Sequence, residues 1–380
     1  MDNFTHSLIG LAASKAGLEK LSPGTTALCI LAANAPDADI VTAFVGGRWF
    51  YLHHHRGITH SVVGTLALAL LLPLVFYLID LLVSWVRKRS PTFRLKGAIL
   101  ASLIVSATHP LMDWTNNYGV RFLLPWNARW FYGDLVFILD PILWVLLGGA
   151  VFLVTSNSRK QIAGWLIAAA IPTFLVFFGP INRGGLTDPT VVRVLWILAI
   201  VALLILFQKQ IGKRWGFRVP QVAIGIALVY IGSLFFIHIV ALRQAKLESA
   251  RIAAERSEQV MKVAAMPTLA NPFHWQCVFE TERAAYRFEL SLIGNDGRDL
   301  VRHEKPQALN PEAIAQAAQD PRTQIFLGFA RFPVARIVGE DCASQTLVQF
   351  ADLRYTEPGS DRGTFSLQVP VDCPVNRSTE

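Results

Sequence analysis

Four histidines and one arginine lie within nine residues, at the start of a long apolar run. The stretch reads His-His-His-Arg-Gly-Ile-Thr-His-Ser and covers residues 53–61. Gly57 permits a turn that lets the imidazoles of His55 and His60 face the same side. Because histidine is the commonest metal-ligating side chain, the stretch predicts a metal-binding turn in which His55 and His60 are ligands.

Three other short motifs supply candidate partners, and six of the nine histidines fall within the first 109 residues. His6 lies near the start of an expected N-terminal amphipathic helix. Asp37 and Asp39 are two residues apart, directly after an apolar segment. His109 and Asp113 are four residues apart, the spacing that places two side chains on one face of a helix. The candidate metal ligands are therefore His6, Asp37, Asp39, His55, His60, His109 and Asp113.

Pro110 leaves two alternatives for the last of these motifs. A helix that continues through Pro110 puts His109 and Asp113 on one face. Alternatively, a new helix begins at Pro110, because a residue before proline disfavours the α region and proline is common at the first helical position. In both cases the two side chains can point toward one cleft.

Histidine and aspartate ligands without a thiolate suit a divalent metal, Zn²⁺ first, with Mn²⁺ or Fe as alternatives. Asp37 and Asp39 can bridge or flank two ions. Such a metal lowers the pKa of bound water to about 7, so hydrolysis is the chemistry that follows most directly. Arg56 is expected to clamp a phosphate or carboxylate oxygen of the substrate, and Asp134 to orient a ligand histidine through its ring N–H.

The composition is that of a membrane protein. Only 16% of the 380 residues are charged and 53% are hydrophobic, whereas soluble domains have about 25% charged residues. The net charge of +8 is interpreted as membrane topology. No basic motif with interleaved aromatics is found, so no nucleic-acid partner is expected. The first basic residue is Lys15, so the positive region of a signal peptide is missing and His6 is expected in the mature chain.

Five runs are long and apolar enough to cross a bilayer, for which about 20 residues are needed. Two further runs, 24–45 and 97–113, are shorter and interrupted by polar residues. Ionisable groups inside such segments are costly and mark functional sites. The five long runs are 62–85, 135–155, 162–180, 191–208 and 221–242.

Loop charge predicts the orientation. Basic residues fill three links that fall on one side if 97–113 crosses, and the positive-inside rule makes that side cytoplasmic. The 53–61 stretch, the loop at 113–134 and the C-terminal tail are then expected on the outer, periplasm-like side of the membrane. The basic residues are Arg87, Lys88, Arg89, Arg94 and Lys96, then Arg159 and Lys160, then Lys209, Lys213, Arg214 and Arg218.

The predicted fold class is a mainly α, polytopic membrane helical bundle with a small strand-rich C-terminal soluble domain. Alternating runs at 275–281, 286–292 and 364–369 predict strands. One disulfide among Cys277, Cys342 and Cys373 is expected if the tail is extracytoplasmic. The expected domains are 1–145 (metal-site membrane domain), 146–242 (additional spans), 243–265 (helical linker) and 266–380 (small α+β or β-rich soluble domain).

Taken together, the motifs over about residues 1–145 resemble the YdjM-like family of bacterial inner-membrane, predicted metal-dependent hydrolases. The matching residues are His6, Pro36-Asp37-x-Asp39, His55-Arg56-Gly57-x-Thr59-His60-Ser61 and His109-x-x-x-Asp113 with a Trp- and Pro-rich loop after it. The resemblance implies hydrolase chemistry at a metal centre, with no settled substrate. The order of ligands is similar, more loosely, to that of zinc-dependent phospholipase C, although this chain lacks that group's further His pair and mature N-terminal Trp.

Several alternatives stay open. His53 and His54 are expected to be solvated neighbours, and His238 a packing histidine. The aromatic residues of 114–134 form either a belt at the headgroup level or the lip of a site that meets a phosphoester or lipid-linked substrate. The rival function is a metal-stabilised membrane scaffold or stress-response partner, whose site would be closed by protein ligands. A transporter is disfavoured because the ionisable residues gather at one end of the spans. The oligomeric state is not predicted.

Overall fold

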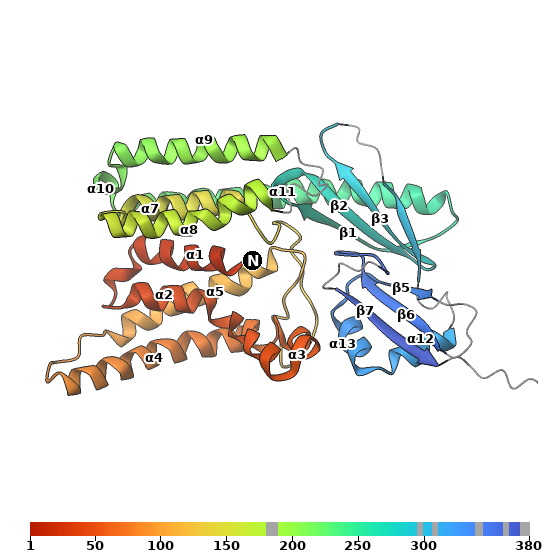
Figure 1. The fold of residues 1–380 in the computed structure, drawn as a ribbon, viewed down its shortest axis with the longest axis horizontal. Coiled ribbons are helices and arrows are strands. Elements are labelled where there is room, and N and C mark those ends of the chain that lie inside the picture. The colour runs from red at the N-terminus through yellow and green to blue at the C-terminus, as the bar shows by residue number, and fades with distance from the viewer. Residues whose placement is uncertain (180–188, 295–298, 306–310, 339–344, 360–364, 373–380) are drawn as a thin grey trace, which may run out of the picture. The chain divides into compact units, whose positions relative to one another are not determined.

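A computed structural model describes residues 1–179, 189–294, 299–305, 311–338, 345–359 and 365–372 of the chain (Figure 1). The chain divides into two compact units. Unit 1 comprises 1–40, 55–237 and 267–274, and unit 2 comprises 41–54, 238–266 and 275–380.

Unit 1 is helical and unit 2 combines sheets with helices. In the first 155 residues the elements are α1 (Asn3–Lys15), η1 (Leu18–Lys20), α2 (Thr25–Asn34), η2 (Ala35–Ile40), α3 (Val41–His54), η3 (Ile58–His60), α4 (Val62–Val86), α5 (Leu95–Trp114), α6 (Pro141–Leu143), a π-helical turn η4 (Trp144–Gly148) and α7 (Gly149–Thr155). They are followed by α8 (Arg159–Phe178), α9 (Pro189–Gln208), α10 (Ile211–Trp215) and α11 (Arg218–Ala254). The remainder contains β1 (Val260–Thr268), β2 (Asn271–Thr281), β3 (Ala284–Ser291), β4 (Val301–Glu304), α12 (Pro311–Ala318), α13 (Pro321–Phe329), β5 (Pro333–Val338), β6 (Gln345–Asp352) and β7 (Ser366–Asp372).

Among the described residues, six helical segments are long and apolar enough to cross a membrane, which confirms a polytopic membrane protein. The predicted run 135–155 differs, because its helical part is the shorter stretch Pro141–Thr155. Asp140 explains where this stretch begins, since its Oδ1 accepts hydrogen bonds from the backbone N–H groups of Ile142 and Leu143 and Pro141 occupies the first turn. The six segments are Thr25–His54, Val62–Val86, Leu95–Trp114, Arg159–Phe178, Thr190–Gln208 and Arg218–Ala254.

Helix α5 runs unbroken through Pro110. Of the two alternatives that the sequence left open, the continuous helix is therefore the one observed. A proline is tolerated in such a helix where neighbouring elements satisfy the backbone groups it frees. Because the helix continues, His109 and Asp113 lie one turn apart on a single face.

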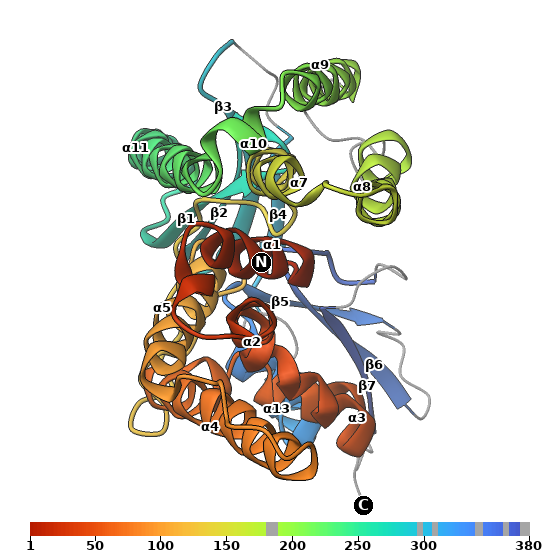
Figure 2. The same ribbon diagram turned by 90° about the vertical axis from the view of Figure 1, so that its left-hand side faces the viewer.

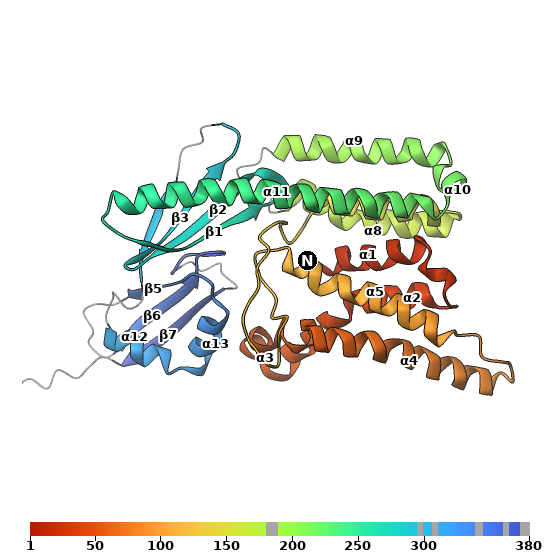
Figure 3. The same cartoon turned by 180° about the vertical axis from the view of Figure 1, so that it is seen from behind.

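Helices α1, α2, α4 and α5 pack together and position the candidate ligands (Figures 1 and 3). A hydrogen bond from the Thr5 N–H to Asp2 Oδ1 (2.9 Å) caps α1. The N–H of Gly64 donates to Ser61 Oγ (3.1 Å) and caps α4. A core of small buried side chains between α2 and α5 includes Cys29 and Ala33. Figure 2 shows these helices end-on, with α2 beside α1 and α4 beside α5.

Gly10 lets α1 approach α2 closely. A Cβ atom at this position would lie 2.5 Å from the carbonyl oxygen of Cys29 and 2.9 Å from the Cβ of Ala33. Small residues at such contacts allow membrane helices to pack backbone against backbone. The glycine therefore fixes the position of the helix that carries His6.

We expect Gly10→Ala to lower the free energy of unfolding in detergent by about 1–3 kcal/mol, the cost typical of overpacking. Thermal unfolding followed by tryptophan fluorescence measures the change. Gly164→Ala is the matched control, because nothing lies within 4 Å of the added Cβ on α8. Equal unfolding temperatures for the two variants would show that α1 does not depend on this contact.

Unit 2 contains two antiparallel sheets, β1-β2-β3-β4 and β5-β6-β7. The strand predicted at 275–281 lies within β2, and the one predicted at 286–292 lies within β3 except for its last residue. Strand β7 covers residues 366–369 of the run predicted at 364–369. The inner face of β7 buries Leu367, Val369 and Val371 against α12, and Trp49 of α3 packs on the same core. The strand-rich tail is thus confirmed, and the positions of its two helices, α12 and α13, were not predicted.

The segment after the last span departs slightly from the sequence expectation. The expected helical linker at 243–265 is helical only as far as Ala254, and β1 has begun by Val260. His238 packs against the ring of Trp275 and lies 3.1 Å from the carbonyl oxygen of Ala265.

Cys277 is a buried free thiol. Cys342 and Cys373 lie outside the described residues, so the disulfide stays a prediction.

Candidate metal centre

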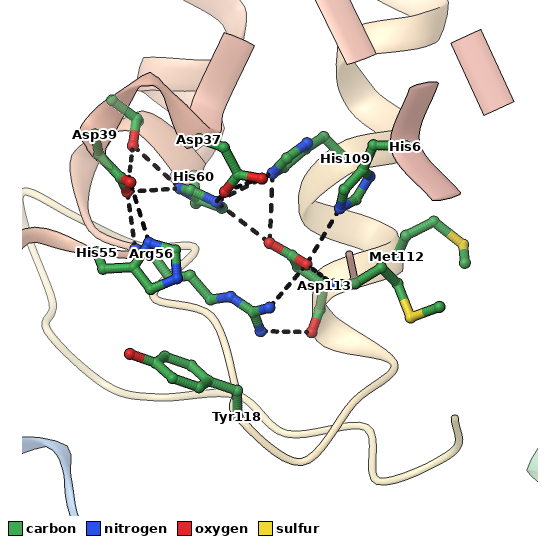
Figure 4. Close-up of polar contacts among 12 residues, drawn as sticks. His6, Asp37, Asp39, His55, Arg56, His60, His109, Met112, Asp113 and Tyr118 are labelled. Carbon is green, nitrogen blue, oxygen red and sulfur yellow. Dashed lines mark hydrogen bonds and ion pairs between the residues drawn. The ribbon is translucent and has the colours of Figure 1, made fainter. Parts of the chain in front are cut away.

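Four separate segments of unit 1 bring the candidate ligands together (Figure 4). Helix α1 supplies one histidine, η2 supplies two aspartates, the turn that ends in η3 supplies two histidines, and α5 supplies a histidine and an aspartate. All seven lie in this cluster: His6, Asp37, Asp39, His55, His60, His109 and Asp113. Their roles as ligands stay predictions.

Four of these side chains form a first ligand group, with one donor atom from each within 4.8 Å of the others. The Nε2 atom of His60 lies 3.3 Å from Asp37 Oδ1 and 3.2 Å from Asp113 Oδ2. The Nε2 atom of His109 lies 3.5 Å and 3.4 Å from the same two oxygens. Three of the four residues are fully buried, and Asp37 is partly exposed. Two carboxylates and two imidazoles thus converge on one point.

A second ligand group joins Asp37, Asp39 and His55. His55 Nδ1 lies 3.0 Å from Asp39 Oδ1. Burial lowers the pKa of His55, which favours the neutral imidazole that a metal requires. Asp37 belongs to both groups, so the two candidate positions are adjacent and share one carboxylate.

The outer contacts of two histidines are compatible with a ring proton on Nδ1 in each. His109 Nδ1 lies 2.6 Å from the carbonyl oxygen of Ala33, to which it can only donate. With its proton on Nδ1, His60 donates to Thr59 Oγ1 (3.1 Å), and the Thr59 hydroxyl donates to Asp39 Oδ2 (3.4 Å). Both Nε2 atoms are then left as lone pairs that point into the cluster.

The two Nε2 atoms lie 3.1 Å apart, and with both ring protons on Nδ1 a cation between or beside them would stabilise the pair. Among the described residues, Asp113 Oδ2 and both ring nitrogens of His6 are buried without a hydrogen-bond partner. Buried polar atoms are normally satisfied, and exceptions indicate a bound ion or a functional site. The residues present therefore fit a divalent metal.

His6 reaches the cluster from the side of α1. Its ring stacks on His109 with centroids 3.8 Å apart, and its Nε2 lies 3.4 Å from Asp113 Oδ1. It is in neither of the two groups described above. The amino group of Met1 also contacts Asp113 Oδ1.

Arg56 is buried and bridges several residues of the cluster. Its Nη2 lies 3.0 Å from Asp113 Oδ1, its Nη1 donates to Asn116 Oδ1 (2.9 Å), and its guanidinium lies over the ring of Tyr118 (4.6 Å). Its backbone N–H donates to Asp39 Oδ2 (3.1 Å) with a left-handed φ of 52°. The guanidinium is thus already engaged within the protein, and the role of a substrate clamp stays a prediction.

Asp134 is buried in the loop between α5 and α6, with a left-handed φ of 54°. It belongs to neither ligand group, and its predicted orienting role is untested. Asn116 was not predicted as part of the site; its Oδ1 also accepts a hydrogen bond from the Tyr118 N–H (2.9 Å). The Asn116-Asn117 pair after the helix gives no functional signal of its own, because asparagine is common in turns. Arg121 Nη2 lies 3.4 Å from the carbonyl oxygen of His55, and its guanidinium lies over Trp130.

We expect Thr59→Val to weaken metal binding about 10- to 100-fold, the usual cost of losing a group that orients a ligand histidine. The substitution keeps the shape but removes the hydroxyl between His60 and Asp39. Competition with a chromophoric chelator measures the affinity. Thr26→Val is the control, because that hydroxyl contacts Ser14 at the other end of α2. An unchanged affinity would mean that the hydroxyl does not orient His60.

The fold and cluster define a polytopic membrane protein with a histidine- and aspartate-rich candidate metal centre. Residues 1–184 match the family model described as YdjM inner membrane protein, which confirms the resemblance predicted from the motifs and supports a multi-pass inner-membrane location. The chain is also similar to the uncharacterized protein YfhP of Bacillus subtilis (strain 168), with 25% identity over 159 residues. That match covers 38% of this chain and 43% of the relative. No solved structure matches.

Proposed function

We propose that the protein is a membrane-bound, metal-dependent hydrolase. The observation that carries the proposal is the pair of adjacent ligand groups that share Asp37. Structural metal sites are usually single and closed by four ligands, whereas adjacent sites that share a carboxylate are typical of enzymes that hydrolyse phosphoesters or peptides. Zn²⁺ suits this ligand set, with Mn²⁺ and Fe as alternatives.

A bound divalent metal would supply Lewis acidity and make water nucleophilic near neutral pH. The side chains around the cluster do the positioning. Hydrogen bonds from His109 Nδ1 to the carbonyl oxygen of Ala33 and from His60 Nδ1 to Thr59 Oγ1 would leave the two inward Nε2 atoms available to a metal. Arg56 holds the Asp113 carboxylate from the opposite side. The partial exposure of Asp37 and His55 leaves one side of the cluster accessible to a substrate.

The proposed substrate is a phosphoester or a lipid-linked molecule. Two observations support this class: His109 and Asp113 lie in the last turns of the candidate membrane span Leu95–Trp114, and Arg121, held over Trp130, lies beside the partly exposed His55. An arginine near the open side can meet an anionic oxygen, and Trp and Tyr are common at the lipid headgroup level. From the loop charges we also propose that the cluster and the C-terminal unit lie on the periplasmic side.

Metal content and hydrolysis, measured together, test the proposal. Purified wild-type protein is expected to contain at least one transition metal per chain and to hydrolyse a chromogenic phosphodiester. His60→Ala combined with Asp113→Ala is expected to lose the metal of the first ligand group and at least about 100-fold of the rate. His53→Ala is the control, because this histidine is exposed and outside both groups.

Two outcomes would overturn the proposal. Wild-type protein without metal would remove its basis. Stoichiometric metal without turnover of phosphodiester, phosphomonoester or lipid-linked substrates would instead support a metal-stabilised scaffold, and a structure with metal bound would then show a centre closed by protein ligands.

A further inference from the structure

An apolar cavity of about 460 Å³ lies in unit 1 among α1, α5, the α6–η4 stretch and α11. Its volume falls within the range of about 300–1,000 Å³ that is usual for ligand sites. Apart from Thr108 and Gln221, its side chains are apolar. It is separate from the ligand cluster, because none of the candidate metal ligands lines it.

The cavity is a slot parallel to the helices. On α5 it is lined by Ile104, Thr108 and Met112, which are four residues apart and so lie along one face. On α11 the lining runs from Gln221 to Ile231, a rise of about 15 Å at 1.5 Å per residue. The slot is therefore long and narrow, and it runs along helices that cross the membrane.

Water cannot occupy most of this slot, since an ordered water needs two to four polar partners. An empty slot would forfeit van der Waals contacts along its whole lining. Two of its walls, α5 and α11, are candidate membrane spans, and the medium around such spans is hydrocarbon. An acyl chain has both the polarity and the elongated shape that the slot requires.

Two basic side chains lie near one end of the slot. Gly17 and Gln221 line that end, and the next turn of α11 toward its N-terminus holds the exposed Arg218. Lys20 lies nearby, with its Nζ 4.2 Å from the ring centre of Phe217. Among the described residues, neither Lys20 nor Arg218 has a carboxylate within ion-pair distance. Two basic side chains at the mouth of an apolar slot suit the phosphate of a lipid whose chain enters the slot.

We propose that this slot binds a phospholipid of the surrounding bilayer, with one acyl chain between α1, α5 and α11 and the phosphate near Lys20 and Arg218. The far end of the chain reaches Met112, which immediately precedes Asp113. It also reaches Ile9, one turn after His6. The lipid thus packs against the back of the two helices that carry the candidate ligands. This binding does not depend on the proposed hydrolysis.

Lipid retention tests the proposal. Full-length protein is purified in detergent with extensive washing, and its phospholipid is extracted and quantified by mass spectrometry. We expect about one intact phospholipid per wild-type chain and at least a fivefold loss for Ala227→Phe, which fills the slot from α11. Val229→Phe is the matched control, because Val229 is 73% exposed on the same helix. Gel filtration verifies that each variant is folded.

Photocrosslinking of the wild-type protein keeps the test decisive if Ala227→Phe does not fold. A phospholipid with a diazirine at the end of its chain is expected to label peptides that contain 104–112 and 224–231 after washing. Arg218→Gln combined with Lys20→Gln is expected to reduce retention of anionic phospholipid severalfold.

Three outcomes would each overturn the proposal. They are washed wild-type protein without phospholipid, label confined to outward residues such as those of α4, and extraction of a molecule other than a phospholipid.

Discussion

Asp37→Asn is expected to remove both candidate metal positions at once. Asp37 belongs to both ligand groups, and its Oδ1 lies 3.3 Å from His60 Nε2 and 3.5 Å from His109 Nε2. An amide keeps the size of the side chain but cancels the charge that a shared ligand must provide. We expect metal content below about one-tenth of wild type and a loss of hydrolysis of at least about 100-fold, since even orienting groups cost 10- to 100-fold.

Two single-group variants provide the comparison. Asp113→Asn alters only the first group, and Asp39→Asn only the second. Each is expected to lower metal content partly, to a value between Asp37→Asn and wild type. Asp80→Asn is the outside control, because Asp80 pairs with Arg89 in the turn between α4 and α5. Wild-type metal content in Asp37→Asn would show that the two groups do not share this carboxylate.

The sequence predicted which residues lie close together, but not how they divide between the two ligand groups. Clustering of His and Asp at the ends of apolar segments was enough to identify every side chain of the cluster, because ionisable groups are costly in such segments. The sharing of Asp37 was not predictable in detail. It depends on the short helix η2, which turns Asp37 toward α5 and Asp39 toward His55, and spacing alone does not determine that rotation.

The limits on predicting the fold have physical causes as well. Apolar length predicted the spans well, but residues 135–139 are as apolar as their neighbours and are not helical, because Asp140 and Pro141 begin the helix at that point. Pro110 suggested a helix boundary by local sterics, yet α5 continues through it within the helical packing of unit 1. At Pro110 packing contacts, and at Asp140 a helix cap, select one of two backbone conformations that the local sequence permits equally.

Arg56→Met is expected to lower the free energy of unfolding by about 3–5 kcal/mol, the range found when one partner of a buried ion pair is removed. Arg56 is 2% exposed and its guanidinium pairs with Asp113, itself 1% exposed. Its loss leaves Asn116 Oδ1 and the Asp113 carboxylate with fewer donors. Denaturant unfolding in detergent, followed by tryptophan fluorescence, measures the change.

The same variant separates the two roles that Arg56 could have. Arg129→Met is the control, because Arg129 is exposed and a surface substitution usually changes stability by less than about 0.5 kcal/mol. Arg56→Lys keeps the charge but loses the fork that serves Asp113 and Asn116 together, so it should restore only part of the stability. If Arg56 clamps a substrate instead, Arg56→Met will raise KM and leave the unfolding midpoint unchanged. The contacts to Asp113, Asn116 and Tyr118 predict the opposite, a less stable protein in which the candidate metal ligand Asp113 is no longer held in place.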